Sequence, residues 1–225
     1  MRSAYNKAIQ AKCARKSDYP FDDYKINKFD TSTQKRAIAK TDILEIKECQ
    51  PTESKRLYME LSRDIFMFSY LCGGINFTDI ANLTAENIIN GRLSYVRQKT
   101  GKRITIGLCD EANVILSKYE NGTNGYLFPI LDMGVHKTAQ QKQNRIHKIL
   151  VKVNANLKYL ANQLGIEANL TTYVARHSFA SVLKKSGTSI AIISEALGHS
   201  DLTTTQIYLD SFDNEQIDNA MKNLL

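Results

Sequence analysis

Apolar residues recur at the three-to-four-residue spacing of amphipathic helices over most of the chain. The clearest stripe predicts a core-facing helix that starts at Thr52 or Glu53, and it comprises Leu57, Leu61, Ile65, Phe68 and Leu71. Gly73-Gly74 should stop this helix, because glycine readily adopts the left-handed conformation that ends helices. Similar patterns predict further helices at residues 2–15, 42–49, 110–119, 138–164, 172–187, 188–198, 201–208 and 214–224.

Short polar side chains mark where these helices should begin, since their oxygens can accept from the unpaired N–H groups of a first turn. We expect such starts at Thr41, Asp110, Thr171 or Thr172, Thr188 and Asp201. Proline and glycine mark the ends, with Pro51 after the helix at 42–49 and Gly165 after the long helix at 138–164. Residues 121–129 form a glycine-rich loop in this interpretation.

Residues 88–108 alternate between apolar and polar positions instead, which is typical of strands. Asn90-Gly91 is a strong signal for a two-residue hairpin turn. The segments 93–97 and 104–108 alternate on either side of a second, basic turn at 99–103. The predicted fold class is therefore α+β, mostly α-helical, with one small three-stranded antiparallel sheet.

Composition narrows the class of protein without identifying it. The 225 residues are 43% hydrophobic, which is ordinary for a globular core, and they contain no apolar run long enough to cross a bilayer. The chain opens without a secretory signal, and its scattered cysteines (Cys13, Cys49, Cys72, Cys109) predict reduced thiols in a cytoplasmic protein. Lysine and arginine number 30 against 23 acidic residues, and a net charge of +7 favours a polyanionic partner.

The C-terminal third contains a set of residues suited to phosphate chemistry. Arg176-His177 precedes Leu197-Gly198-His199, and Tyr208 follows His199 by nine residues. A guanidinium such as that of Arg176 can hold phosphate oxygens in a bidentate fork, and His199 can donate a hydrogen bond to the same phosphate. The phenol of Tyr208 can then attack the phosphorus as a nucleophile. Together these groups could cleave a phosphodiester without a metal.

The segments 173–180, 197–200 and 203–208 resemble the signature of the tyrosine recombinases, also called the phage integrase family. The resemblance covers roughly residues 40–212 and is closest to integrases of conjugative transposons and related mobile elements. It implies the catalytic domain fold of that family and cleavage of duplex DNA by transesterification. Tyr208 would form a 3′-phosphotyrosine and leave a free 5′ hydroxyl. Because the bond energy stays in this link, strand exchange would need no ATP, and the resemblance implies no cofactor and no metal.

The same resemblance assigns roles to other residues. Lys99 lies in the hairpin where the family has its general-acid lysine, and Lys102 is a nearby competitor. Tyr173 stands where the commonest pattern has a histidine, so it either contacts the phosphate or packs, and the general base for Tyr208 stays open. His177 is expected to be buried and structural, with direct contact to the phosphate as the alternative.

The first arginine of the family pattern is missing, because Asn76 stands in its place. Asp79, three residues later, matches the acidic residue of that pattern and should orient a cation or cap a helix. An asparagine brings no charge, and loss of one cationic donor slows phosphoryl transfer strongly. We expect another arginine to reach in, with Arg97 as the first choice and Arg63 as the second. Two alternatives remain: an enzyme that holds the phosphate more weakly, or a member of the family that does not cleave DNA.

The resemblance also predicts the organisation and partners of the chain. Residues 1–40 should be a remnant of the core DNA-binding domain, with its last helix and a basic linker, and 41–225 the catalytic domain. The chain is thus expected to be a fragment or a late-starting protein. Its partner should be double-stranded DNA at a recombination site, bound by a homo-tetramer on paired sites that is a monomer in isolation. The helix at 214–224 would be exchanged between subunits or pack on its own subunit.

Two alternatives share many of these features. A type IB topoisomerase-like enzyme would use the same tyrosine chemistry without paired sites. A cleavage-deficient DNA-binding accessory protein would account for Asn76 and Tyr173. In all three cases the expected location is the bacterial cytoplasm, at the nucleoid when bound to DNA.

Overall fold

The computed structural model describes residues 1–22, 37–50, 58–120, 125–199 and 201–210, without the side chains at 207, 208 and 210. The chain divides into two compact units, Met1–Gln34 and Lys35–Leu225. The first unit contains helix α1 (Arg2–Gln10) and a short 3₁₀ helix (Lys16–Asp18). The predicted helix over 2–15 therefore ends earlier, because Lys12 adopts a left-handed conformation with φ of 57°.

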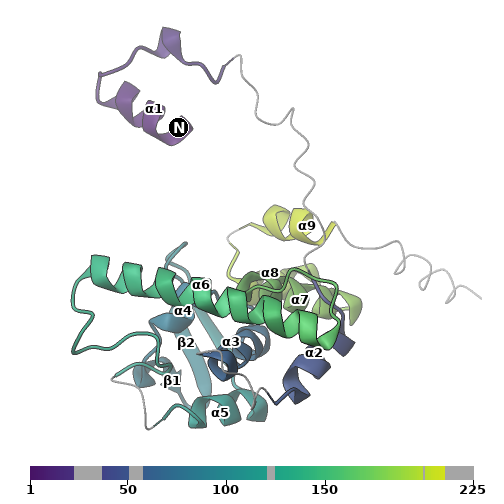
Figure 1. The fold of residues 1–225 in the computed structure, drawn as a ribbon. Coiled ribbons are helices and arrows are strands. Elements are labelled where there is room, and N and C mark those ends of the chain that lie inside the picture. The colour runs from purple at the N-terminus through teal and green to yellow at the C-terminus, as the bar shows by residue number, and fades with distance from the viewer. Residues whose placement is uncertain (23–36, 51–57, 121–124, 200, 211–225) are drawn as a thin grey trace, which may run out of the picture. The chain divides into compact units, whose positions relative to one another are not determined.

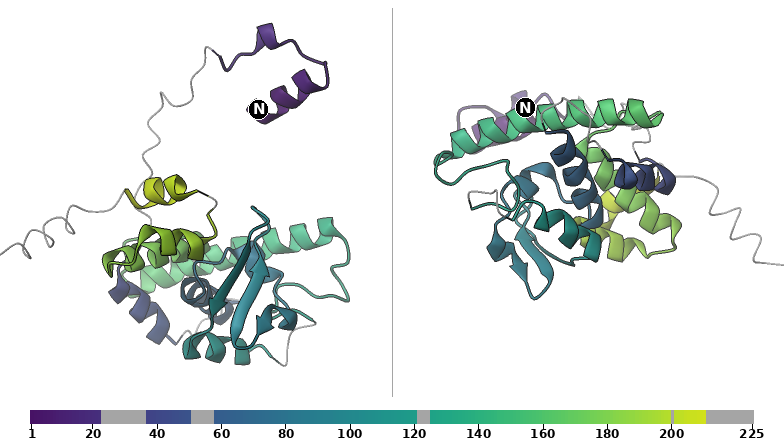
Figure 2. Two further views of the ribbon diagram at one scale, coloured as in Figure 1. Left: turned by 180° about the vertical axis from the view of Figure 1, so that it is seen from behind. Right: turned by 60° about the horizontal axis from the view of Figure 1, so that its bottom comes forward.

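The second unit is mostly helical, as the sequence predicts (Figure 1). Its described helices are α2 (Lys40–Glu48), α3 (Met59–Leu71), α4 (Phe77–Ala81), α5 (Asp110–Ser117), α6 (Ala139–Leu164), α7 (Thr172–Lys185), α8 (Ile190–Leu197) and α9 (Leu202–Asp210). The long helix α6 runs along one face of this unit, and the sheet lies on the face behind it (Figure 2). None of the described helices is both long and apolar enough to span a membrane.

The predicted three-stranded antiparallel sheet is confirmed. Strands β1 (Ile88–Ile89), β2 (Arg92–Val96) and β3 (Arg103–Gly107) pair in that order. Asn90 and Gly91 both have positive φ, 50° and 71°, as a two-residue hairpin turn of the primed type requires. The second hairpin closes between Arg97 and Lys102, whose backbone N–H and carbonyl pair at 2.9 Å.

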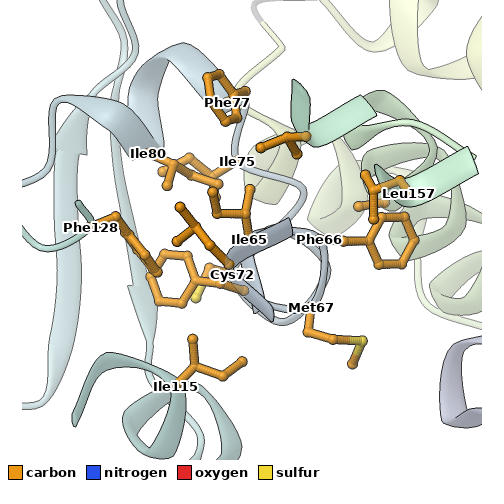
Figure 3. Close-up of a cluster of buried hydrophobic side chains, with 14 of the residues drawn as sticks. Ile65, Phe66, Met67, Cys72, Ile75, Phe77, Ile80, Ile115, Phe128 and Leu157 are labelled. Carbon is orange, nitrogen blue, oxygen red and sulfur yellow. The ribbon is translucent and has the colours of Figure 1, made fainter. Parts of the chain in front are cut away.

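Helix α3 is the centre of the core because it is buried on nearly every side. Leu61, Ile65 and Phe68 of the predicted stripe are buried, while Leu71 is half-buried and Leu57 lies outside the described residues. The helix contacts α2, α5, α6 and α7, and Figure 3 shows its side chains packed against Phe128 and Leu157. Burial of such side chains contributes roughly 1.5–3 kcal/mol each, so α3 fixes the positions of the elements around it.

Several predicted helix starts are wrong by one or two residues. The helix at 42–49 begins at Lys40 rather than after Thr41, and its first turn is closed by the Asp42 carboxylate, which accepts from Ala39 N–H at 3.2 Å. Helix α5 includes Asp110, and α8 is capped by Ser189 instead of Thr188.

Other predicted boundaries agree with the structure. Thr171 is the N-cap residue of α7, although its side chain makes no capping hydrogen bond, and Gly165 and Gly198 end α6 and α8 in left-handed conformations. Three predictions lie outside the described residues: the helix start at Thr52 or Glu53, most of the basic linker and the helix at 214–224.

Candidate active site

Arg176 occupies the second turn of α7 and is 2% exposed. Its Nη1 donates to the carbonyl of Gly74 at 2.9 Å, and its Nη2 donates to the carbonyl of Leu197 at 2.5 Å. A Cβ on Gly74 would lie 2.7 Å from Cγ of Arg176 and 2.8 Å from its Cα. Only glycine at 74, with φ of 68°, therefore lets this loop approach α7 closely enough to hold the guanidinium.

His199 follows the glycine that ends α8. Gly198 has φ of 65°, a left-handed conformation that favours glycine, and a Cβ there would lie 2.5 Å from Cδ1 of Ile104, so a larger residue would also have to displace the end of that side chain on β3. The turn places His199 Nε2 3.1 Å from Nη2 of Arg176 and Nδ1 2.9 Å from Oγ1 of Thr205. An arginine only donates hydrogen bonds, so Nε2 accepts and Nδ1–H donates to Thr205.

The surroundings of His199 keep its ring neutral. Burial, followed by the positive charges of Arg176, Arg97, Lys102 and Lys99, lowers the pKa of His199 to about 4. These cations converge on one half-buried imidazole, and an arriving anion would reverse their effect on its charge. The site is therefore electrostatically suited to a phosphate.

Arg97 reaches the same place from the end of β2. It is 7% exposed, and its Nη1 lies 3.2 Å from the Gly198 carbonyl and 3.4 Å from the Leu197 carbonyl. Its Nε is buried and has no hydrogen-bond partner among the described residues. Arg97 and Arg176 thus meet at the carbonyl of Leu197.

Arg63 lies elsewhere. It donates from Nε and Nη2 to the carboxylate of Asp64, at 3.0 and 2.8 Å, and from Nη1 to the Cys49 carbonyl. Lys118 and Tyr119 bind the same carboxylate, so this buried cluster links α3 to α5. No described contact joins Arg63 to Arg176 or His199.

The second hairpin is attached to the site at two points. Asp79 is buried, and its Oδ1 accepts from the backbone N–H of Gln98 at 3.0 Å. Lys102 donates to the carbonyl of His199 at 3.2 Å. Lys99 is exposed at the tip of the turn between them. Asp79 therefore positions the hairpin, and Lys102 lies closer to the histidine than the sequence suggests.

Three predicted residues lie at the margin of this cluster. Asn76 is half-buried and precedes α4, which is too short for sequence periodicity to predict; its side chain makes no capping bond to that helix. Tyr173 is 44% exposed in the first turn of α7, and its ring meets the edge of His177 at a centroid distance of 4.6 Å. The described contact of Tyr173 is therefore packing against His177.

Tyr208 lies on α9, and its side chain is outside the described atoms. The helix itself is well anchored. Leu209 is fully buried against Ala180, Ile193 and Leu197, and Lys184 donates to the Leu209 carbonyl at 2.8 Å. These contacts hold the backbone of the candidate nucleophile on α7 and α8, the helices that present Arg176 and His199.

Two residues near the site escape the sequence interpretation. Thr205 forms a hydrogen bond with His199. The sequence signal that could have indicated this is its position one helical turn before Tyr208, which puts both residues on one face of the helix. Tyr95 is buried on β2; burial and the charge of Asp79 raise its pKa, while Arg176 and Arg97 act in the opposite direction. Among the described residues, no group of three His, Cys, Asp or Glu side chains could hold a metal ion.

The fold is a helical domain with a small sheet, and its candidate site brings two arginines and a histidine next to a helix that bears a tyrosine. Together the fold and the site define the class of protein. The chain belongs to the phage integrase family, whose sequence model matches residues 13–215. It is 31% identical over 146 residues to the tyrosine recombinase XerD of Pseudomonas putida, which is 62% of this chain and 46% of that protein. It is 30% identical over 148 residues to the tyrosine recombinase XerA of Pyrococcus horikoshii, which is 65% of this chain and 50% of that protein. The chain thus spans about half the length of these relatives.

Solved structures agree on the fold. An integrase of the transposon Tn1549, in complex with a circular-intermediate DNA, superimposes with a TM-score of 0.65 at 16% identity, over 99% of this chain and 76% of that one. The XerA recombinase gives a TM-score of 0.59 at 19% identity, over 85% of this chain and 66% of that one.

Proposed function

We propose that this protein is a tyrosine-type site-specific DNA recombinase, which cuts and rejoins duplex DNA through a 3′-phosphotyrosyl intermediate. The observation that carries the proposal is the convergence of Arg176, Arg97 and His199 beside the helix that bears Tyr208. Membership of the phage integrase family supports the same reaction.

The two arginines would hold the scissile phosphate. A guanidinium has five N–H groups in one plane, so Arg97 can bind backbone carbonyls through Nη1 and still donate to a phosphate oxygen. Charge develops on these oxygens in the transition state, and donors fixed in place beforehand stabilise it. Arg176 and His199 would bind the remaining oxygens.

The other residues would complete the reaction. Tyr208 would attack the phosphorus, and Lys99 would protonate the leaving 5′ oxygen, with Lys102 as the competing acid. Asp79 would hold the hairpin that carries these lysines through its bond to Gln98. Tyr173, His177 and Asn76 would support the phosphate site from its edge.

The proposed partner is double-stranded DNA at a recombination site. The net charge of +7 and the buried cations of the site favour a polyanion. We assign residues 1–40 to the end of a core DNA-binding domain with its basic linker, and 41–225 to the catalytic domain. A homo-tetramer on paired sites would form from protein that is monomeric in isolation, and the DNA substrate places its action at the nucleoid.

We further propose that the reaction serves integration of a mobile element. The likeness in fold to the Tn1549 transposon integrase supports this role. The absence of an arginine at 76, together with the sequence around Arg176, resembles the pattern of integrases from conjugative transposons.

A nicked suicide substrate tests the proposal, because loss of the short strand after cleavage traps the protein on DNA. The full chain should give an adduct that survives denaturation, and Tyr208→Phe should give none. Tyr159→Phe, on the exposed face of α6, is the matched control and should react like the wild type. An adduct of equal yield from Tyr208→Phe would show that the nucleophile is another residue.

The second candidate is a DNA-binding accessory protein that does not cut. The uncharged Asn76 and the packing of Tyr173 on His177 favour it. Sequence-independent DNA binding with no adduct on any substrate would support this reading. Relaxation of a supercoiled plasmid that carries a single site would instead favour a topoisomerase-like activity.

A further inference from the structure

The mechanism proposed above gives no role to the hydrogen bond between Thr205 and His199. Thr205 is fully buried on α9, one turn before Tyr208, and its Oγ1 lies 2.9 Å from Nδ1 of the imidazole. The other described contacts that anchor α9 are of a different kind: Leu209 packs in an apolar cluster, and its carbonyl accepts from Lys184. Among the described contacts, Thr205 is therefore the side chain of α9 that joins the nucleophile's helix to the phosphate site.

The bond has a defined direction while the ring faces Arg176. Nε2 accepts from Nη2 of Arg176 at 3.1 Å, so the neutral ring carries its proton on Nδ1 and donates it to Thr205. The low pKa of His199, about 4, makes this neutral ring the form present at pH 7.

Phosphate binding requires the opposite arrangement. An acceptor lone pair on Nε2 would face a phosphate oxygen and repel it, so Nε2 must carry a proton to bind the anion. In a neutral ring, Nδ1 then becomes an acceptor. A threonine hydroxyl both donates and accepts, and it can turn about its C–O bond, so Thr205 can bind Nδ1 in either state. A valine of the same shape could do neither.

We propose that Thr205 is a positioning residue, which fixes the ring of His199 by binding Nδ1 in both tautomers and so lets Nε2 carry the proton that it donates to the DNA phosphate. The role rests on the proposed recombinase function. This role couples the docking of α9 to the orientation of His199, because α9 must be packed in place for Thr205 to reach the ring. The histidine is thus correctly held when the helix carrying Tyr208 is docked.

Thr205→Val and Thr205→Ser separate the hydroxyl from the shape of the side chain. Loss of the group that orients a metal-bound histidine typically costs about 10- to 100-fold, and by analogy Thr205→Val should form the DNA adduct about 10- to 100-fold more slowly. Thr205→Ser should remain within about threefold of the wild type, since it retains the hydroxyl. Thr204→Val, at an exposed position on the same helix, is the matched control and should have no effect.

Nitrogen-15 NMR of the histidine ring provides a readout that does not depend on cleavage. The wild type without DNA should show His199 with its proton on Nδ1, assigned by the signal that is missing in His199→Gln. Thr205→Val should shift both ring nitrogens toward the values of a mixture of tautomers, and Thr205→Ser should not.

Unchanged ring signals in Thr205→Val, or a rate within twofold of the wild type, would overturn the proposal. Equal slowing by Thr205→Ser would overturn it too, since the methyl group and not the hydroxyl would then matter. If the wild type itself forms no adduct, the recombinase function fails, while the ring signals still decide whether Thr205 holds His199.

Discussion

Arg97 and Arg176 donate to the same backbone oxygen, the carbonyl of Leu197, from Nη1 at 3.4 Å and Nη2 at 2.5 Å. One guanidinium comes from the end of β2 and the other from α7, and both are nearly buried. Two like charges held this closely repel each other, and the carbonyls at the end of α8 offset only part of that repulsion. A bound anion would relieve the remainder, so the pair is best explained as two halves of one phosphate clamp.

Replacement of Arg97 tests this explanation. Arg97→Ala should lower the rate of adduct formation about 10²- to 10³-fold, as expected when one charged donor to a developing oxyanion is removed. Single-turnover kinetics on a nicked substrate would measure the change. Arg97→Lys should recover only part of the rate, because an ammonium cannot reproduce the planar fork.

Arg63→Ala is the matched control for Arg97→Ala. It removes a partner of the buried Asp64 carboxylate, so it should lower the free energy of unfolding by about 1–3 kcal/mol. The rate of the folded fraction should stay near that of the wild type. Equal losses of rate from the two variants would contradict the assignment of Arg97 to the missing position.

Gly74→Ala should disturb the site through the backbone. A methyl group at 74 would lie 2.8 Å from Cα of Arg176, so the loop must move away from α7 and its carbonyl must release the guanidinium. Gly165→Ala is a close control, because it has nearly the same φ, 69°, and nothing within 4 Å of the added Cβ.

Both glycine variants share the conformational cost of about 1–2 kcal/mol for a left-handed alanine. Gly74→Ala should lose about 1–3 kcal/mol more from overpacking, measured by chemical denaturation, and should also lose most of its cleavage rate. A Gly74→Ala protein as stable and as active as Gly165→Ala would show that the loop is not needed to hold Arg176.

The identity of the general acid can be decided with a modified substrate. A 5′-bridging sulfur leaves without protonation, so it restores the rate of a variant that lacks only the acid. Lys99→Ala should be slow on ordinary DNA and recover on the sulfur substrate. Lys102→Ala should be slow on both, because its bond to the His199 carbonyl positions the histidine. The reverse pattern would assign the acid to Lys102.

The sequence predicts the parts of the fold that depend on local pattern better than those that depend on packing. Long helices and hairpin turns follow from local pattern, so α6 and the Asn90-Gly91 turn agree with the structure closely. Helix starts depend on which of two neighbouring polar residues the packing selects, and Ser189 caps α8 although Thr188 was the expected cap. Helix α4 has too few residues for a periodic pattern, so the sequence indicates it only through the expectation that Asp79 caps a helix.

In the site, too, local motifs could be predicted from the sequence and contacts made by packing could not. Arg176 and His199 stand in motifs, and Arg97 could be named because the predicted hairpin brings β2 toward them. The bonds of Lys102 and Thr205 to His199 depend on how a turn and a helix face the ring, which one sequence does not reveal. The charge of Asp79 was expected to orient a cation or cap a helix, and it binds the backbone of Gln98 instead.

The low pKa of His199 predicts how stability changes with pH. Its value in the folded protein, about 4, lies below the 6.5 of a free histidine, so the unfolded chain binds more protons between those limits. The stabilisation is complete above about pH 6.5 and is lost as the pH falls toward 4. Between pH 7 and pH 5 the loss is at most about 2 kcal/mol, and nearer 1 kcal/mol after solvent screening of this half-buried ring. His199→Gln lacks the titrating group, so urea denaturation at the two pH values should show a smaller loss in this variant than in the wild type. Equal losses would mean that neither burial nor the cations around the ring depress the pKa of His199 in the folded protein.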